Sequence, residues 1–513
     1  MRRFLIYSLF LVVACGDGSR SSTLQYYFTY DPRSLDPSLS TDVPTGEVIA
    51  LLFDNLTQFN VNGELGPGLA RSWETDSTGR VYTFHLRSGA TFHDGTSITS
   101  KQVRRTFIRA LDPATKGGRA WPLFPIAGAR AYANGGAEPS GIATPDDSTI
   151  VLTLEEPLNV FPKLLAMPVT AITPESLGAN FGQNPVGSGP WKFVSWAHDD
   201  AIVLVRNDAY WGEKPLSDSI RIRIIPEALT QAAEYESGQL SVVEIPFGES
   251  RRWEAEHGPE ILRRPAIRDV YIAINTTRGP LKDVRVRRAL NYAVDMPTIL
   301  RTVIGGRGIQ AAGALPPGTL GYDSTRTPYP HDPDKAKELL AQAGYAQGFS
   351  LKLWRTSREQ YSRIAQALQQ QLGAVGITVE IVERDASSAR SAARAGETDL
   401  FLTDWYADYP DPENFNYPLF YSGSKGPGGN YAFLQDPSLD ALILRARSTL
   451  DDTEKAGLAR EIDQRVFDSA PWIFCYFPVD WWARRPEVTG WEIPAIFNGQ
   501  RWTTTRVQES KRR

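Results

Sequence analysis

The sequence is 513 residues long, and 42% of its residues are apolar and 11% are aromatic. This is enough apolar material for at least two hydrophobic cores, so we expect a large globular protein with two lobes. The 55 basic and 59 acidic residues give a formal net charge of -4 without the basic stripe that nucleic-acid binding requires, which excludes nucleic acid as a partner.

The first residues indicate export. Two arginines after the initiating methionine precede an apolar run from Phe4 to Ala14, which is too short to span a bilayer. The run ends in Val12-Val-Ala-Cys15, which resembles a bacterial lipoprotein signal. That resemblance implies that residues 1–14 are a signal peptide, that Cys15 is lipidated, and that residues 15–23 form a tether. An ordinary secretory signal with an incidental cysteine is the alternative.

No later stretch approaches the roughly 20 apolar residues of a membrane helix. We therefore expect a periplasmic or otherwise extracytoplasmic protein that is anchored to the membrane by the lipid on Cys15. With Cys15 lipidated, Cys475 has no second cysteine to pair with, so no disulfide is expected. Cys475 is predicted to be buried in a strand between Phe474 and Tyr476.

Taken in order, the chain begins with a predicted strand at Leu24–Thr29, which leads through a turn to a short apolar helix at Glu47–Phe53. Strands at Trp73–Thr75 and Val81–Leu86 flank a turn and predict a β-meander. A helix capped near residues 99–100 is expected to follow.

The region from residue 351 to residue 405 predicts alternating strands and helices, because apolar residues recur there first with period two and then at helical spacing. The predicted order is strand Leu351–Trp354, helix Tyr361–Leu372, strand Ile377–Ile381, helix Ser387–Ala395 and strand Leu400–Trp405. Parallel strands joined by helical crossovers form open sheets that bind ligands beyond the carboxyl ends of the strands. Asp408, just past the third strand, is therefore expected at the ligand-binding edge.

Two aspartates in the loop after this strand receive different interpretations. Asp411 precedes Pro412 and Glu413, the pattern of a helix N-cap with proline at the first helical position, so we interpret Asp411 as structural. Asp408 has no such local role, because Pro410 leaves no room for a helix to start there. Asp408 is either a solvated turn residue or, given its position, a ligand-binding residue.

Six blocks of sequence follow one another in an order that is typical of one family. They are Pro67-Gly-Leu-Ala70 with Phe92-His-Asp-Gly95, Gly187-Ser-Gly-Pro-Trp191 with residues 206–212, Tyr271-Ile-Ala-Ile-Asn-Thr276 with residues 284–295, residues 316–322, residues 332–345, and Trp405-Tyr-Ala-Asp-Tyr-Pro-Asp-Pro412. Together these blocks resemble the bacterial extracellular solute-binding proteins of family 5, the oligopeptide- and dipeptide-binding components of ABC importers. The resemblance extends over the whole chain after the signal.

The resemblance implies an α/β type II periplasmic-binding-protein fold, in which two lobes are joined by a hinge and an additional domain is inserted. The first lobe would consist of residues 24–53, 181–274 and 486–513. The additional domain would span residues 54–180, and the second lobe residues 275–485.

The resemblance also implies how a ligand is held. Asp408 would pair with the amino terminus of a peptide, while main-chain groups of Asp404 and Tyr406 would pair with the extended ligand. A segment of the other lobe would do the same. Such main-chain pairing gives affinity whatever the ligand side chains are. The predicted ligand-binding residues are Thr41, Asp42, Val43, Asp404, Trp405, Tyr406 and Asp408.

We expect a monomeric, non-enzymatic protein without a cofactor, which delivers peptides to the permease subunits of an ABC transporter. The five histidines lack the short-range spacing of a metal site. A Gly-x-x-x-x-Gly-Lys-Ser/Thr phosphate loop is absent from the sequence, so ATP hydrolysis would belong to another subunit.

Two alternatives stay open. The same fold can bind a non-peptide solute such as an oligosaccharide, a metal chelate or haem. In that case an aromatic wall could stack on the solute, formed by Trp405, Tyr406, Tyr409, Phe415, Tyr417, Phe420 and Tyr421. A secreted hydrolase would instead use two carboxylates from the group Asp404, Asp408, Asp411 and Glu413.

Overall fold

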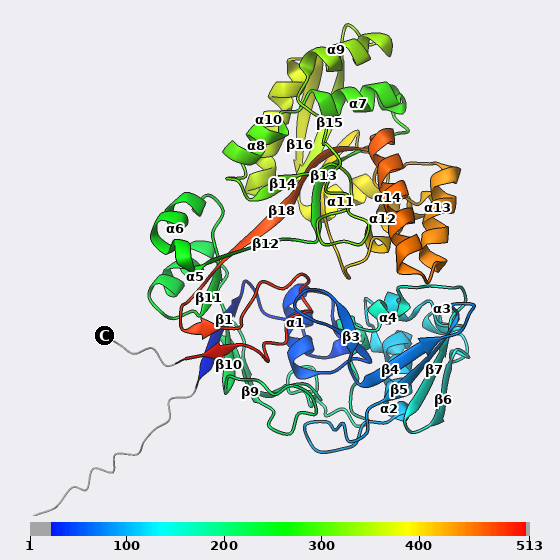
Figure 1. The fold of residues 1–513 in the computed structure, drawn as a ribbon, viewed down its shortest axis with the longest axis vertical. Coiled ribbons are helices and arrows are strands. Elements are labelled where there is room, and N and C mark those ends of the chain that lie inside the picture. The colour runs from blue at the N-terminus through cyan, green and yellow to red at the C-terminus, as the bar shows by residue number, and fades with distance from the viewer. Residues whose placement is uncertain (1–21, 509–513) are drawn as a thin grey trace, which may run out of the picture.

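The structure, a computed structural model, describes residues 22–508. The predicted signal peptide, Cys15 and nearly all of the predicted tether therefore lie outside the described residues. Between residues 22 and 508 no helix is both long and apolar enough to cross a membrane. The chain forms two lobes, one above the other in Figure 1, and an additional domain that lies beside the lower, first lobe.

The first lobe is built on a four-stranded sheet in the order β1-β10-β9-β8. Its strands are β1 (Thr23–Phe28), β8 (Trp191–Ala197), β9 (Ala201–Arg206) and β10 (Ser219–Ile224), and its helices are α1 (Val43–Leu52), α5 (Ala228–Glu236) and α6 (Ser250–His257). Strand β1 runs parallel to β10, and the other pairs are antiparallel. Near the carboxyl end of the chain, the short strands β19 (Val488–Thr489) and β20 (Arg506–Val507) pair with each other.

The additional domain contains an antiparallel sheet in the order β4-β5-β7-β6. The strands of that sheet are β4 (Ala70–Thr75), β5 (Val81–Leu86), β6 (Ile142–Asp146) and β7 (Thr149–Thr153), and β2 (Thr57–Phe59) pairs separately with β3 (Leu65–Pro67). The helices of the domain are α2 (Ser100–Leu111), α3 (Ala129–Ala133) and α4 (Phe161–Leu164). Helix α2 starts where predicted, because Thr99 and Gln102 form a reciprocal capping box. The helix buries Val103 and Phe107 in the core of this domain.

The second lobe contains the largest sheet, in which β18-β13-β17-β15-β16 are neighbours in that order. The strands are β13 (Arg268–Ile274), β14 (Gly308–Gln310), β15 (Phe349–Thr356), β16 (Ile377–Arg384), β17 (Leu400–Tyr406) and β18 (Trp472–Arg484). The helices are α7 (Val284–Tyr292), α8 (Met296–Thr302), α9 (Pro333–Gln342), α10 (Glu359–Gly373), α11 (Ala386–Arg394), α12 (Glu413–Phe420), α13 (Pro437–Ser448) and α14 (Asp452–Ser469).

The predicted strand-helix-strand-helix-strand unit is confirmed as β15-α10-β16-α11-β17. Strand β15 is parallel to both β16 and β17, so the three strands share one carboxyl edge. Cys475 is buried in β18, as predicted, and burial raises the pKa of its thiol.

Two segments connect the lobes. The first half of β18 pairs with β13, and its last residues pair with β11 (Val242–Glu244) and β12 (Ile261–Pro265) on the side of the first lobe. Figure 1 shows β18 running diagonally from the upper lobe to the lower one, with β12 beside it. The predicted boundary at residue 274 assigns β13 to the first lobe, whereas its hydrogen bonds lie in the sheet of the second lobe.

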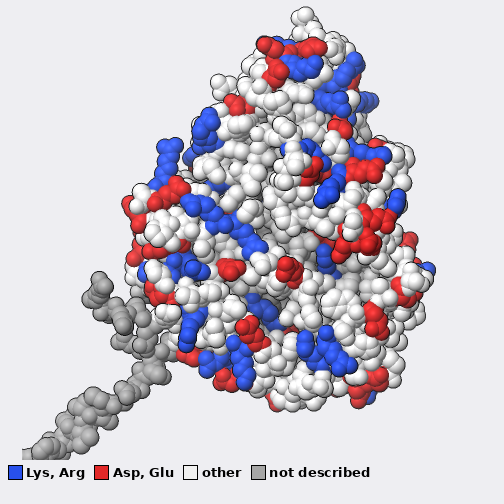
Figure 2. Space-filling model, in the orientation of Figure 1, with Lys and Arg blue, Asp and Glu red and all other residues white. Residues whose placement is uncertain are grey.

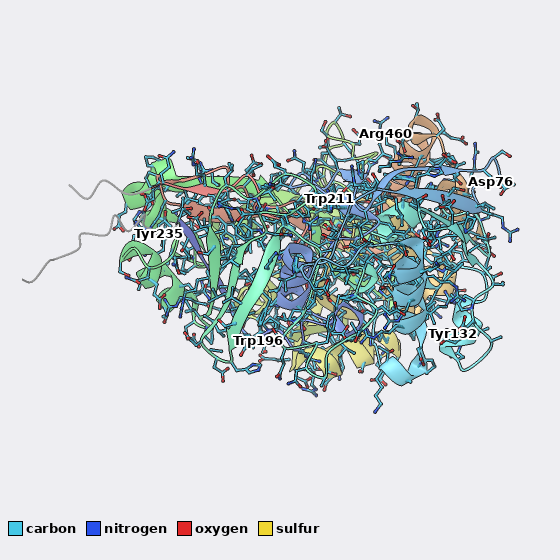
Figure 3. The ribbon with its side chains drawn as sticks, turned by 90° about the horizontal axis from the view of Figure 1, so that it is seen from below. Asp76, Tyr132, Trp196, Trp211, Tyr235 and Arg460 are labelled. Atoms are coloured by element: carbon cyan, nitrogen blue, oxygen red, sulfur yellow. The ribbon has the colours of Figure 1, made fainter. Side chains whose placement is uncertain are left out.

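The first lobe and the additional domain are joined by a buried carboxylate. Asp54 is completely buried and accepts hydrogen bonds from Tyr210 Oη (2.9 Å), Trp211 Nε1 (3.0 Å) and Arg501 Nη1 (2.7 Å). In Figure 3, Tyr235 of the first lobe and Asp76 of the additional domain lie toward opposite ends, and Trp211 lies between them. This fully paired acid fixes the junction of the two bodies.

Candidate ligand-binding cleft

Strand β17 carries the main-chain groups predicted to meet a ligand, and its pairing shows where they point. Ala407 donates its N–H to Ile267 O (3.1 Å), and Asn275 donates to Asp399 O (2.9 Å), so the odd-numbered residues of β17 are those bonded to β13. Because antiparallel pairs alternate, Asp404 and Tyr406 direct their N–H and C=O groups to the opposite edge. Strand β15 covers that edge only at Leu400 and Phe401, so the edge beyond Phe401 has no strand pairing in the described part of the chain.

Asp408 lies just past the end of this edge. Its N–H donates to Asn414 Oδ1 (3.1 Å), which also accepts from Trp405 Nε1 (3.2 Å), so the loop is held by its own amide contacts. Among residues 22–508, the carboxylate of Asp408 has no hydrogen bond or ion pair. Burial raises the pKa of Asp408, and the charge of Arg119 lowers it in part. The loop therefore presents a partly buried carboxylate that has no hydrogen bond or ion pair within residues 22–508.

The three residues before Ala407 contribute differently. The carboxylate of Asp404 is paired with Arg358 (Nη1 to Oδ2, 3.0 Å), so only its main chain is free for a ligand. Trp405 packs against the core, and Tyr406 has 38% of its surface exposed. These positions suit main-chain pairing through Asp404 and Tyr406, and their predicted contacts with a ligand stay predictions.

The predicted residues of the first lobe lie at the start of α1. Asp42 Oδ1 accepts the Thr45 N–H (3.0 Å), and Val43 is the first helical residue. The predicted helix start at Glu47 is wrong, because the helix begins four residues earlier and includes Pro44 in its first turn, where proline is well tolerated. The ligand contacts of Thr41, Asp42 and Val43 stay predictions.

Arg119 of the additional domain connects the two halves of the candidate site. It lines a recess together with Ser40, Asp42, Trp121 and Phe497, and its charge also acts on Asp408. Figure 2 shows the surface indented across the middle of the molecule, with charges of both signs along the indentation. Sequence reasoning missed Arg119, because nothing in its neighbourhood marks a site.

The structural interpretation of Asp411 is confirmed, with more partners than predicted. Asp411 is fully buried, and its Oδ1 accepts the Glu413 N–H (2.9 Å). Its Oδ2 accepts from Lys163 Nζ of the additional domain (2.6 Å) and from Lys455 Nζ of α14 (2.7 Å). Burial raises the pKa of Asp411, but the charges of the two lysines outweigh burial, so the pKa lies below its ordinary value. Helix α12 begins at Glu413, so Pro412 is the N-cap residue and not the first helical residue. The predicted N-cap position of Asp411 is therefore wrong by one residue, although its carboxylate still accepts a main-chain N–H of the first turn.

The carboxylates proposed for a hydrolase are occupied. Asp404 is paired with Arg358, Asp411 with two lysines, and Glu413 with Arg447 (2.7 Å). Asp408 is the one acid of this group without an ion pair in the described range, and hydrolysis by paired carboxylates needs two acids in complementary roles. The arrangement suits capture of a cation better than acid–base chemistry.

Most of the candidate stacking aromatics are packing residues. Tyr409, Phe415 and Phe420 are buried in the core. Tyr417 is stacked on Tyr421, with ring centroids 4.9 Å apart, and the guanidinium of Arg447 covers its ring. This leaves Tyr406 as the most exposed aromatic ring of the predicted wall.

A second charged group lines the region where the lobes meet. Arg268, opposite Tyr406 in the sheet, lies 3.8 Å from Asp480. Burial lowers the pKa of Arg268, but the charges of Asp480 and Asp404 outweigh it and raise the pKa above its ordinary value. Arg307 donates to Ile245 O (2.7 Å) and lies 3.5 Å from Glu244. Arg268 and Arg307 thus each have an acid nearby.

Two lobes are joined by paired crossing strands, and within residues 22–508 both the carboxylate of Asp408 and the outer edge of β17 lack protein partners. This arrangement fits a protein that captures a solute between its lobes. Comparison with known proteins makes the class specific. The sequence profile of the bacterial extracellular solute-binding proteins, family 5 (middle region), matches residues 64–427.

Several characterised relatives match nearly the whole chain. The glutathione-binding protein GsiB of Pectobacterium atrosepticum is 31% identical over 455 residues, covering 86% of each chain. The dipeptide-binding protein of Escherichia coli is 29% identical over 508 residues (93% of each chain). Heme-binding protein A of Haemophilus influenzae is 30% identical over 507 residues, covering 92% of this chain and 90% of the relative.

Solved structures agree with the fold. The periplasmic binding protein DppA of Helicobacter pylori, in complex with the peptide STSA, has a TM-score of 0.77 and 27% identity, over 95% of this chain and 98% of the other. The unliganded open form of the murein tripeptide binding protein MppA has a TM-score of 0.86 and 24% identity, over 96% and 99% of the two chains. The chain therefore belongs to the bacterial extracellular solute-binding proteins of family 5, the periplasmic binding components of ABC importers.

Proposed function

We propose that this protein captures peptides in the cleft between its lobes and delivers them to the permease of an ABC transporter. One observation carries the proposal: the partly buried carboxylate of Asp408 has no hydrogen bond or ion pair among residues 22–508, and it lies at the end of the free edge of β17. An extended peptide would pair its main chain with Asp404 and Tyr406 and its α-ammonium with Asp408.

The ammonium is the feature that distinguishes a peptide from other solutes. A buried ammonium needs an opposite charge, because an unpaired buried charge costs several kcal/mol. Asp408 supplies that charge without competing with an internal ion pair. The relatives include glutathione- and heme-binding proteins, and glutathione also carries a free ammonium, whereas haem does not.

The test is calorimetric titration of the purified wild-type protein with a tripeptide, its N-acetylated form, glutathione, haem and an oligosaccharide. We expect the free tripeptide to bind and the acetylated form to lose about 10² to 10³ in affinity, the cost of leaving a buried charge unpaired. Equal binding of the free and acetylated peptides, or binding of haem or sugar alone, would replace this proposal with the non-peptide alternative. Native mass spectrometry of the protein as purified would identify any solute carried with it.

We also propose that closure of the two lobes accompanies capture. The first lobe is assigned residues 24–53, 181–267 and 486–513, the additional domain residues 54–180, and the second lobe residues 268–485, because β13 pairs within the sheet of the second lobe. The two crossing segments at β12–β13 and β18 support a hinge between them. X-ray scattering of the monomer should show a smaller radius of gyration with saturating peptide, and unchanged curves would contradict closure.

Membrane anchoring through Cys15 is part of the proposal. It is supported by the sequence Val12-Val-Ala-Cys15 that ends the apolar run. Wild-type protein should carry a lipidated Cys15 as its mature N-terminus and partition with membranes, and Cys15→Ser should not be lipidated. A mature N-terminus mapped elsewhere would contradict the lipoprotein assignment.

A further inference from the structure

The loop that carries Asp408 in the second lobe packs against the additional domain. Tyr409, the next residue, lies beside Trp121, and the centroids of the two rings are 6.4 Å apart. Pro410 lies against Gly63, where an added Cβ atom would be 3.1 Å from Cγ of the proline. The acid proposed to bind the ligand's ammonium is therefore followed directly by residues that contact the additional domain.

Lys163 of α4 makes the polar part of this contact. Its Nζ donates to the main-chain oxygen of Pro410 (3.2 Å) and to Oδ2 of Asp411 (2.6 Å). Asp411 is fully buried, and the side chain of Lys163 is 25% exposed. One ammonium group from the additional domain thus holds two consecutive residues of the loop by charge-assisted hydrogen bonds.

Helix α4 is itself fixed to the second lobe. Asn159, two residues before the helix, donates its side-chain amide to the main-chain oxygens of Ala446 (2.8 Å) and Thr449 (2.5 Å) around the carboxyl end of α13. Its Oδ1 accepts from Nζ of Lys455 (3.1 Å), the second lysine of the buried carboxylate. Lys163 therefore reaches the loop from a segment whose position relative to the second lobe is fixed.

Asp408 depends on its main chain for its position, because its carboxylate has no hydrogen bond or ion pair within residues 22–508. Its N–H donates to Asn414 Oδ1 (3.1 Å), and the pairing of β17 fixes the residues before it. Lys163 fixes the residues after it. A binding group is fully effective only when its supporting groups hold it within about 0.5 Å of the productive position. Loss of the lysine contact would therefore release one side of Asp408.

We propose that Lys163 is a positioning residue for the ammonium site, which acts on the ligand through Asp408. The inference rests on the proposed function, and it gives the additional domain a part in that function: the domain supports the acid that pairs with the α-ammonium of a peptide. The effect is confined to ligands that carry an ammonium, because a ligand without one gains no affinity from a preorganised Asp408.

The experiment compares a tripeptide with its des-amino analogue in the wild type, Lys163→Met, Lys163→Gln, Lys163→Arg and Lys101→Met. Titration calorimetry gives the affinity ratio of the two ligands for each protein. Because the readout is a ratio, a loss of affinity that comes from a merely structural defect cancels. Lys101 of α2 is the matched control in the same domain, since its ion pair with Asp147 (3.0 Å) lies at the surface.

We expect Lys163→Met to lower the ratio at least about tenfold below the wild-type value, which corresponds to about 1.4 kcal/mol. Lys163→Gln keeps a donor and should lower the ratio less. Lys163→Arg keeps the charge and the donors and should restore most of it, and Lys101→Met should match the wild type. The direction of the change is diagnostic, because removal of a positive charge from this region would by itself strengthen ammonium binding. A lower ratio therefore reports a displaced carboxylate.

Three results would overturn the inference. They are an unchanged ratio in Lys163→Met, a lowered ratio that Lys163→Arg does not restore, and an equal decrease in Lys101→Met. If Lys163→Met does not fold, Lys163→Gln decides in its place, and an unchanged ratio there is equally contradictory. A different result, equal binding of the two ligands by the wild type, would contradict the proposed function itself, because Asp408 would then hold no ammonium.

Discussion

Asp408 and Asp411 lie three residues apart in one loop, but their carboxylates differ in burial and in hydrogen-bond partners. Asp411 is completely buried and accepts bonds from two lysines and a main-chain N–H. Asp408 is only partly buried, and no side chain within residues 22–508 donates to its carboxylate. The difference teaches where to look for function: a buried acid with all its partners holds the fold together, whereas one without partners leaves room for a ligand.

Other acids of the protein can also be divided into those with partners and those without. Asp54 resembles Asp411, because three donors from distant segments converge on it. Glu47 resembles Asp408, because burial raises the pKa of its carboxyl, to about 8, and it has no ion pair among residues 22–508. Substitutions at paired groups should therefore damage stability, and substitutions at unpaired groups should damage binding.

The largest effect on stability is expected from Asp411→Asn. The substitution leaves Lys163 and Lys455 next to each other without an anion, and breaking a buried pair in this way costs about 3 to 5 kcal/mol. Chemical denaturation should show this loss relative to the wild type. Asp334→Asn is the matched control, because Asp334 is exposed on α9 and its loss should cost less than about 0.5 kcal/mol. Equal stabilities for the two variants would mean that the Asp411 ion pairs are not structural.

A smaller effect on stability, which depends on pH, is expected from protonation of His93, because both of its ring nitrogens are hydrogen-bonded in the folded protein. Its Nδ1 accepts the Gly187 N–H (3.2 Å) and its Nε2 donates to Gly189 O (3.1 Å), so the neutral ring bridges two segments. Burial lowers the pKa of His93 to about 4. A lowered pKa means that the unfolded chain binds the proton first, so stability is complete above about pH 6.5 and is lost as the pH falls toward 4.

The loss of free energy of unfolding from His93 should reach at most about 3 kcal/mol across that window. His93→Gln should flatten this part of the stability profile, measured by denaturation at several pH values. His85→Gln changes a histidine at the surface of β5 that contacts Glu74, and it serves as the control. A wild-type profile that is flat between pH 6.5 and 4 would show that His93 does not titrate as a buried neutral ring.

The smallest effect is expected from Asp408→Asn on the stability of the empty protein, and its sign is opposite to that of Asp411→Asn. Because burial raises the pKa of Asp408, its ionised form opposes folding at neutral pH. Removing the charge should leave stability unchanged or raise it by up to about 1 kcal/mol. Thermal unfolding without ligand measures this, and a clear loss of stability would indicate that Asp408 has an internal partner.

The sequence predicted the parts of the fold that local patterns encode. Apolar periodicity gave the unit from β15 to β17, and its topology led to Asp408 at a strand end. Capping chemistry gave the start of α2. The start of α1 was not predicted from capping, although Asp42 is its N-cap and Pro44 lies in its first turn.

Contacts between distant segments could not be predicted. Lys163 and Lys455 meet Asp411 from 248 and 44 residues away, and no periodic signal marks such pairs. The absence of partners is equally invisible in a sequence. Glu47 is an ordinary helical glutamate until the structure shows that no cation of residues 22–508 reaches it.

The most direct test of the central claim, that Asp408 is left unpaired for a ligand's ammonium, is a thermodynamic cycle measured by titration calorimetry. A tripeptide and its des-amino analogue, which lacks the ammonium but adds no bulk, are titrated into the wild type and Asp408→Asn. Each change alone should lower affinity by about 10² to 10³, the cost of one broken buried pair. The two changes together should cost little more than one, because both remove the same interaction. If the losses add in full, or if the wild type binds both ligands equally, Asp408 does not hold the ammonium.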